Sequence, residues 1–171
     1  GMLVNNTALG PAPAGLIATG SVTSRTLADR WGEVANPKDF GAVGDGVTDD
    51  TVALQAFFTA LATTDYGTAS ADGDYLVSSA LTLTGSLTKN IIGDTRIIAN
   101  AAIADVLTLT NVQNTTWERI TVLGTGTTNN HSTFTCDTGL TLNDCARSSF
   151  GYIEVKRFAF AGVCSIAGNN N

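Results

Sequence analysis

Carboxylates are the side chains of this chain with the clearest capacity for chemistry, and they fall into two groups. The first group lies in a glycine-rich stretch and consists of Asp39, Asp45, Asp49 and Asp50. The second group is scattered over the last third of the chain and consists of Glu118, Asp137, Asp144 and Glu154. Clustered carboxylates can bind a divalent cation, and a suitably spaced pair can hydrolyse a glycosidic bond. The elements that position each group decide which chemistry is open to it.

The early acids fit a structural role better than a metal site. Three glycines in this stretch predict tight turns that bring the acids close together. The acids do not match the calcium-loop pattern, and helix capping accounts for two of them, with Thr48 as N-cap and Asp49 and Asp50 in the first turn. We therefore predict no metal and no cofactor. The residues with a predicted structural role are Asp39, Phe40, Gly41, Gly44, Asp45, Gly46, Thr48, Asp49 and Asp50.

Hydrophobic periodicity predicts one main helix followed by short strands. The helix has an apolar stripe at helical spacing, formed by Leu54, Phe57, Phe58 and Leu61. Val47 is expected to pack on Val52 as a hydrophobic staple. A second short helix is expected over residues 24–31. After residue 65 the pattern becomes that of strands, in the segments 75–77, 81–83, 91–92, 97–98, 106–109 and 120–122.

An internal repeat predicts how the strands are arranged. Residues 105–122 align without a gap on residues 138–155, at an offset of 33, and a weaker gapped echo begins at Leu81. Strands that stack on equivalent strands of the previous circuit place like side chains over one another. The repeat therefore predicts an all-β chain folded as a parallel β-helix. An antiparallel sandwich is the alternative, although it leaves an ungapped repeat unexplained.

The inward-facing pattern slips once within each repeat. The slip lies between Trp117 and Ile120, so we expect a bend at Glu118–Arg119 and another at Gly151–Tyr152. Residues 124–137 are expected to form a long polar loop. By the same pattern, Trp117 is expected to stack on Phe150 inside the fold, rather than to offer a sugar-stacking platform.

The late acids do not form an obvious catalytic pair. Glu118 and Glu154 lie one circuit apart and three residues out of register, on the order of 11 Å. Glycosidases need a separation of about 5–5.5 Å (retaining) or about 6.5–9.5 Å (inverting). Asp144 aligns with Asn111, as expected of a turn position, and Asp137 lies in the long loop. We predict no catalytic residue in this chain.

Composition and charge exclude several functional classes. Charged residues are only 14% of the chain, whereas Thr, Gly and Asn make up 57 of its 171 residues, as in a turn-rich β protein. The net charge of −6 argues against binding to nucleic acid or to an anionic membrane. No apolar run reaches the ~18 residues of a membrane helix. His131 is an isolated loop residue, and we interpret Cys136, Cys145 and Cys164 as small buried residues without metal-ligand spacing.

The opening motif resembles a known family. The segment Lys38–Thr51, its helix and residues 73–83 together resemble the start of the pectate-lyase-like superfamily of right-handed parallel β-helices. Residues 20–34 are similar to a neck segment of bacteriophage tailspike and tail-fibre proteins. The resemblance covers roughly residues 20–100 by motif and the remainder by architecture. It implies a single-stranded right-handed parallel β-helix, first coils only, with an N-terminal neck and a short capping α-helix.

The resemblance also implies a function for the intact protein. It implies a homotrimer in the virion tail, made in the host cytoplasm, that binds and depolymerises a bacterial capsule or lipopolysaccharide. It further implies contacts with other tail or baseplate proteins through the N-terminal side. This stretch would serve as structural cap and trimer base and would be inactive on its own. The candidate substrate-binding residues are Glu118, Asp137 and Glu154.

The expected domain organisation has three parts. Residues 1–35 would form the neck and trimerisation segment, residues 36–65 the opening motif and capping helix, and residues 66–171 the first three to four coils. We expect the chain to be a C-terminally truncated β-helix, with any active site downstream of residue 171. Two alternatives remain open: a fragment of a cellular pectate-lyase-like or polygalacturonase-like enzyme, and a non-catalytic structural virion module.

Overall fold

Short strands separated by turns alternate between two sheets along this chain. The computed structural model describes residues 32–63, 67–85, 89–125, 138–158 and 161–166. The early elements are β1 (Val34–Ala35), the 3-10 helix η1 (Pro37–Phe40), β2 (Asp45–Asp49), α2 (Thr51–Thr63), β3 (Thr68–Ser70), β4 (Gly73–Val77) and β5 (Leu81–Thr84). The later strands are β6 (Asn90–Ala99), β7 (Asp105–Thr110), β8 (Thr116–Leu123), β9 (Thr138–Asn143), β10 (Ser149–Lys156) and β11 (Ala161–Ile166).

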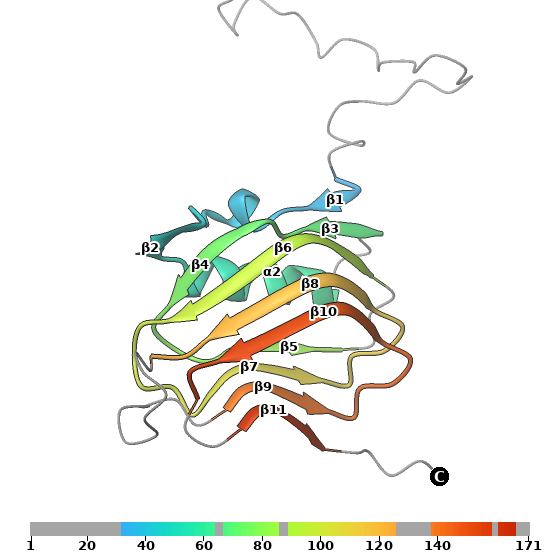
Figure 1. The fold of residues 1–171 in the computed structure, drawn as a ribbon. Helices are drawn as coiled ribbons and strands as arrows, with labels where there is room; N and C mark the ends of the chain where they lie inside the picture. The colour runs from blue at the N-terminus through green and yellow to red at the C-terminus, as the bar shows by residue number, and fades with distance from the viewer. Residues whose placement is uncertain (1–31, 64–66, 86–88, 126–137, 159–160, 167–171) are drawn as a thin grey trace, which may run out of the picture.

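The strands form two parallel sheets. In the first sheet the order is β1-β3-β6-β4-β2, with β8 pairing with β6 and β10 pairing with β8. In the second sheet the order is β11-β9-β7-β5. From β4 onward the chain passes from one sheet to the other and back, so that each circuit adds one strand to each sheet (Figure 1). Every strand pairing within the described segments is parallel, which excludes the antiparallel sandwich.

The strand register confirms the internal repeat. Trp117 pairs with Phe150 in the first sheet, and Leu107 pairs with Leu140 in the second, both at the offset of 33. The earlier echo is also real, because Leu81 pairs with Leu107 at an offset of 26. Equivalent side chains therefore lie beside one another across adjacent strands.

The expectation of separate strands at 91–92 and 97–98 is wrong. Both segments belong to the single strand β6, whose register against β8 shifts between Ile91 and Asp94. Gly93 adopts a φ of 101°, which a residue with a side chain rarely adopts. The glycine lets the strand make an irregular step and then continue, whereas sequence periodicity interprets the interruption as two strands.

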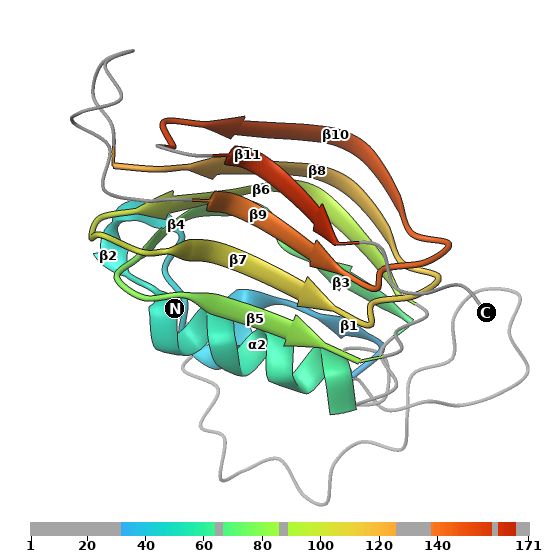
Figure 2. The same cartoon turned by 90° about the horizontal axis from the view of Figure 1, so that it is seen from below.

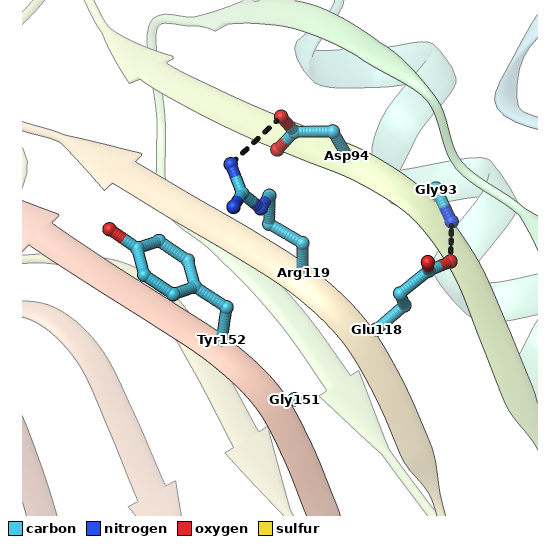
Figure 3. Close-up of a pocket in the computed structure, with 6 residues that line it drawn as sticks. All are labelled: Gly93, Asp94, Glu118, Arg119, Gly151 and Tyr152. Carbon is cyan, nitrogen blue, oxygen red and sulfur yellow. Dashed lines mark hydrogen bonds and ion pairs between the residues drawn. The ribbon is translucent and has the colours of Figure 1, made fainter.

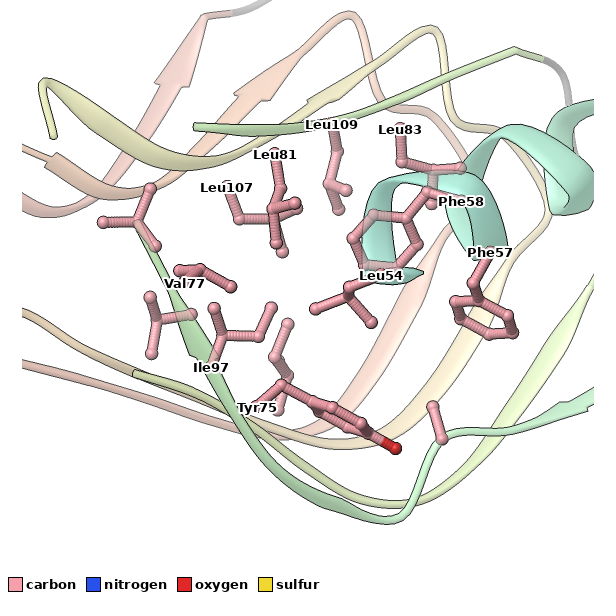
Figure 4. Close-up of a cluster of buried hydrophobic side chains, with 14 of the residues drawn as sticks. Leu54, Phe57, Phe58, Tyr75, Val77, Leu81, Leu83, Ile97, Leu107 and Leu109 are labelled. Atoms are coloured by element: carbon pink, nitrogen blue, oxygen red, sulfur yellow. The ribbon is translucent and has the colours of Figure 1, made fainter. Parts of the chain in front are cut away.

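The hydrophobic core lies between the two sheets, and α2 covers it at the end where the first circuits lie (Figure 2). The predicted helical stripe is confirmed, because Leu54, Phe57, Phe58 and Leu61 are all fully buried. The stripe packs beside inward-facing residues of both sheets, among them Tyr75, Val77, Leu81, Leu83, Ile97, Leu107 and Leu109 (Figure 4). Burial of this apolar surface is the main force that holds α2 against the sheets.

The predicted start of the helix is wrong by two residues. The helix α2 begins at Thr51, so that Asp50 directly precedes it and accepts a hydrogen bond from the amide of Leu54. Thr48 lies in β2 instead, where its amide and hydroxyl bond to Asp45. The hydroxyl that was expected to cap the helix is therefore engaged in a local turn.

The expected hydrophobic staple is also wrong, since Val47 is 78% exposed and Val52 is 84% exposed. By contrast, the expected internal stack is confirmed. The rings of Trp117 and Phe150 lie 6.4 Å apart at an angle of 22°, and Trp117 is buried.

Several expectations concern residues outside the described part of the chain. These are the short helix at 24–31, nearly all of the neck, the polar loop from residue 126 onward, and the residues Cys136, His131 and Asp137. Among the described residues, no helix has the length and apolar character needed to cross a membrane.

Candidate functional site

The bends in the first sheet create the most distinctive surface of the described chain. Within β8, Trp117 and Ile120 are buried, whereas Glu118 and Arg119 between them are both exposed. The predicted slip in the inward-facing pattern is thus confirmed. Because β8 continues unbroken from Thr116 to Leu123, the bend places two successive polar side chains on the solvent-facing side of one strand.

Glycines on the two neighbouring strands lie beside Glu118. Gly151 of β10 lies next to it, and a Cβ atom at Gly151 would lie 2.5 Å from the Glu118 carbonyl oxygen. Gly93 of β6 lies on the other side and holds the positive φ described above. Because neither residue carries a side chain, backbone alone lines the surface at these two positions.

Both glycines and Glu118 line an open cavity of about 420 Å³ (Figure 3). Its lining comes from the bends of three adjacent strands and consists of Gly93, Asp94, Glu118, Arg119, Gly151 and Tyr152. We refer to this cavity as the bend groove. Its volume lies within the range of about 300–1,000 Å³ that small-molecule sites occupy.

Arg119 occupies the centre of the polar wall of the bend groove. It is the cross-strand partner of Asp94 on one side and of Tyr152 on the other. Its guanidinium lies 3.6 Å from the Asp94 carboxylate and 4.4 Å from the centre of the Tyr152 ring. The ion pair and the cation–π contact together hold the guanidinium between the two neighbours, with about half of the side chain exposed.

The polar groups of the bend groove retain unused hydrogen-bonding capacity. Glu118 accepts one hydrogen bond through Oε2, from the amide of Gly93 at 2.9 Å. Its Oε1 atom has no partner among the described residues, and the Arg119 guanidinium donates no hydrogen bond to any of them. A carboxylate acceptor and a guanidinium with free donors thus line the same cavity.

Glu154 lies outside the bend groove. Its carboxylate forms an ion pair with Lys156 at 2.6 Å and accepts a longer hydrogen bond of 3.4 Å from the Tyr152 hydroxyl. The bond from Lys156 is the largest cause that holds the Glu154 pKa below its ordinary value. Among the three candidate substrate-binding residues, only Glu118 lines the cavity, and Asp137 lies outside the described residues.

Asp144 occupies a turn, as its alignment with Asn111 predicts. Both residues are exposed and adopt the left-handed backbone region, with φ of 51° and 55°. Asn and Asp tolerate this conformation better than most residues, which explains their use at the same corner of successive circuits.

The early acids are each engaged in separate local contacts. Asp50 is buried and accepts hydrogen bonds from the amides of Val43 and Gly44. Asp39 accepts a bond from the Asn36 amide, Asp45 from residues 47 and 48, and Asp49 from residues 51 and 78. Within the described ranges, no group of three or more His, Cys, Asp or Glu side chains could hold a metal ion. These carboxylates fix the turns that lead into α2.

Hydrogen bonds to two of these carboxylates lower their pKa values. For Asp45, the largest cause is the bond from the Thr48 amide. For Asp49, it is the bond from the Ser78 hydroxyl. Nearby, burial raises the pKa of Tyr75 to about 12, with further contributions from the negative charges of Asp50 and Asp72.

Sequence reasoning found the bends but missed most of the groove that they form. Asp94, Arg119 and Tyr152 were not among the candidate site residues. One signal was available in the sequence. The inward-facing pattern slips at Glu118–Arg119, which exposes two successive side chains, and Gly151 lies 33 residues after Glu118, at the repeat offset. The cross-strand partner on β6 had no such signal, because its register depends on the irregular step at Gly93.

Comparisons with known proteins relate this fold to phage proteins. No protein-family model matches the chain. Its structure is similar to ORF18 of Geobacillus virus E2, at 24% identity and a TM-score of 0.56, over 74% of this chain and 26% of that one. It is also similar to the Dettilon tailspike protein, at 18% identity and a TM-score of 0.63, over 78% of this chain and 24% of that one. The chain spans about a quarter of each of these proteins, and it shares the fold of that part of a phage tailspike.

Proposed function

We propose that this chain is the N-terminal portion of a phage tailspike and forms the first circuits of a right-handed, single-stranded parallel β-helix. The observation that carries the proposal is the in-register stacking of circuits in two parallel sheets over α2, in a fold shared with a tailspike. Each strand supplies the pairing surface for the equivalent strand of the next circuit, as a solenoid requires. Under this proposal, α2 is the cap of the first circuit.

The intact protein is then made in the host cytoplasm and becomes part of the virion tail. It binds a bacterial capsule or lipopolysaccharide and depolymerises it. Residues 1–35 form the neck, which contacts other tail or baseplate proteins and contributes to a homotrimer. Residues 36–65 form the cap, and residues 66–171 form the first circuits. The chain spans only about a quarter of the similar phage proteins, which supports a division of labour between a base and a larger remainder.

Light scattering over a range of concentrations tests the trimer. We expect a mass about three times that of the 17.6 kDa chain. A mass equal to one chain at every concentration would contradict the assignment of this portion as the trimer base.

A cleavage assay tests the assignment of the activity. We expect the intact protein, and not residues 1–171 alone, to shorten the surface polysaccharide of the host on which the phage adsorbs. Release of reducing ends by the 171-residue chain would show instead that catalytic groups lie within it.

A further inference from the structure

We propose that the bend groove binds one unit of an uncharged, hydroxyl-rich saccharide. Glu118 accepts hydrogen bonds from saccharide hydroxyls, Arg119 donates hydrogen bonds to them, and Tyr152 forms an apolar flank. This inference gives a binding role to a part of the chain that otherwise serves as cap and base.

The shape of the bend groove supports a ligand of this kind. The cavity is open and lies across three adjacent strands, so a chain-like ligand can enter and leave at its rim. Gly93 and Gly151 line the groove on either side of Glu118 and carry no side chain, and at Gly151 an added methyl group would collide with backbone. No side chain of these two residues therefore covers the floor of the groove.

The unused polar groups match the chemistry of a sugar. Each hydroxyl of a saccharide both donates and accepts a hydrogen bond. Glu118 offers the free acceptor Oε1, whereas the Arg119 guanidinium offers planar donors that make no hydrogen bond within the described residues. Neighbouring hydroxyls of one ring can satisfy both groups at once.

The charges around the bend groove favour an uncharged ligand. Asp94 already neutralises Arg119, and Glu118 adds a further negative charge to the lining. The Glu154 carboxylate lies just beyond Tyr152. The ring of Tyr152 makes a cation–π contact with the positively charged guanidinium of Arg119. A sugar carboxylate would have to displace Asp94 and approach Glu118, so like-charge repulsion disfavours an acidic saccharide.

The choice of a saccharide as the ligand rests on the proposed function. The shape and the charge of the groove are observations that do not depend on that function. The two can fail separately. If the chain forms a trimer and the intact protein cleaves polysaccharide while the groove binds no sugar, only the present inference is wrong.

Nuclear magnetic resonance titration of the nitrogen-15-labelled chain tests the inference. The uncharged probes are glucose, galactose, mannose, rhamnose and N-acetylglucosamine, and the acidic probes are glucuronate and galacturonate. We expect at least one uncharged sugar to shift the amide signals of Gly93, Glu118 and Gly151 in a saturable manner. The acidic sugars should shift the same signals less at equal concentration.

Two variants connect the shifts to the proposed contacts. Glu118→Gln and Arg119→Ala should each weaken the binding of the responding sugar about tenfold or more, as expected for loss of hydrogen bonds to a charged group. Arg96→Ala is the matched control, because Arg96 pairs with Asp74 on the same sheet and does not line the groove. The control should bind the sugar like the unsubstituted chain.

Three results would overturn the inference, and the first two need no variant. The groove amides could remain unshifted by every uncharged sugar, or the acidic sugars could produce the larger shifts. In the third, Arg96→Ala would weaken binding as much as Arg119→Ala, which would show that the effect is not specific to the groove. Circular dichroism of each variant establishes that it is folded before its titration is compared.

Discussion

The two sheets of each circuit come from the same repeat, yet they differ in how regularly their strands pair. In the second sheet, Leu81, Leu107 and Leu140 stack in register, and no shift interrupts the pairing of β5, β7 and β9. In the first sheet, the inward pattern slips within β8, and the pairing of β6 with β8 shifts register. The bend groove lies at this interruption.

The contrast between the sheets shows how a repetitive fold acquires a specific surface. Uninterrupted register places equivalent side chains beside one another on successive strands, which stabilises the frame but repeats the same exterior. An interruption exposes two successive side chains and requires glycine on the adjoining strand, as Gly151 shows beside Glu118. We therefore expect substitutions in the two regions to affect different properties.

The largest effect should follow from a break in the regular sheet. Leu107 is fully buried between its partners in β5 and β9. Leu107→Ala should lower the free energy of unfolding by about 2–5 kcal/mol, through lost apolar contact and the cavity that remains. Urea denaturation followed by circular dichroism measures the change. A loss below about 1 kcal/mol would mean that the leucine ladder does not support the frame.

The next effect should follow from filling the glycine position in the irregular sheet. Gly151→Ala would place a methyl group against the Glu118 carbonyl and should cost about 1–3 kcal/mol of stability, as overpacking does. Gly67→Ala is the matched control, because no atom lies within 4 Å of its added Cβ. If the two variants unfolded at the same urea concentration, the close approach at the bend would be refuted.

A smaller effect is expected for the polar wall of the bend groove. The ion pair of Arg119 with Asp94 is about half exposed, so solvent screens it strongly. Arg119→Ala should therefore change the free energy of unfolding by no more than about 1 kcal/mol while it weakens sugar binding. Measured by the same urea denaturation, a loss comparable to that of Leu107→Ala would assign Arg119 to the frame instead.

The smallest effect should appear in the response of the frame to acid. Hydrogen bonds from Ser78 and Thr51 lower the pKa of Asp49, so the folded chain favours the charged form. Its contribution to stability is present above the unfolded-state pKa and is lost as pH falls through the lowered folded-state value. Asp49→Asn should therefore reduce the loss of stability between about pH 7 and about pH 3.

Thermal unfolding at the two pH values measures this acid response. Asp144→Asn is the control, because Asp144 lies at an exposed turn where the previous circuit already carries Asn111. An unchanged acid response in Asp49→Asn, relative to the unsubstituted chain, would contradict the role of these hydrogen bonds.

The sequence predicted the parts of the fold that depend on repetition. The alignment of residues 105–122 with residues 138–155 predicted the parallel register in both sheets, because stacked strands require like residues at equal spacing. The stripe from Leu54 to Leu61 likewise predicted the buried face of α2. These features leave a periodic signal, so a single chain is enough to find them.

The parts that the sequence did not predict depend on which of several nearby groups a residue bonds to or pairs with. Thr48 looks like an N-cap, but its hydroxyl bonds to Asp45, and the helix begins only after Asp50. The groove likewise requires Asp94 to lie opposite Arg119, which follows from a register shift at Gly93. Nothing in the spacing of residues 91–98 indicates where the ladder resumes. Contacts made by a single irregular step leave no periodic signal.

The register across that step is the most direct test of the account. Parallel circuits stack in register, and the interruption between β6 and β8 lies at the groove. Nuclear Overhauser contacts between backbone protons of β6 and β8 measure this register. We expect Ile91 beside Trp117 and Asp94 beside Arg119, so that the offset changes from 26 to 25 across Gly93. A constant offset of 26 along the whole of β6 would contradict this register, because Asp94 would then lie opposite Ile120 and not opposite Arg119.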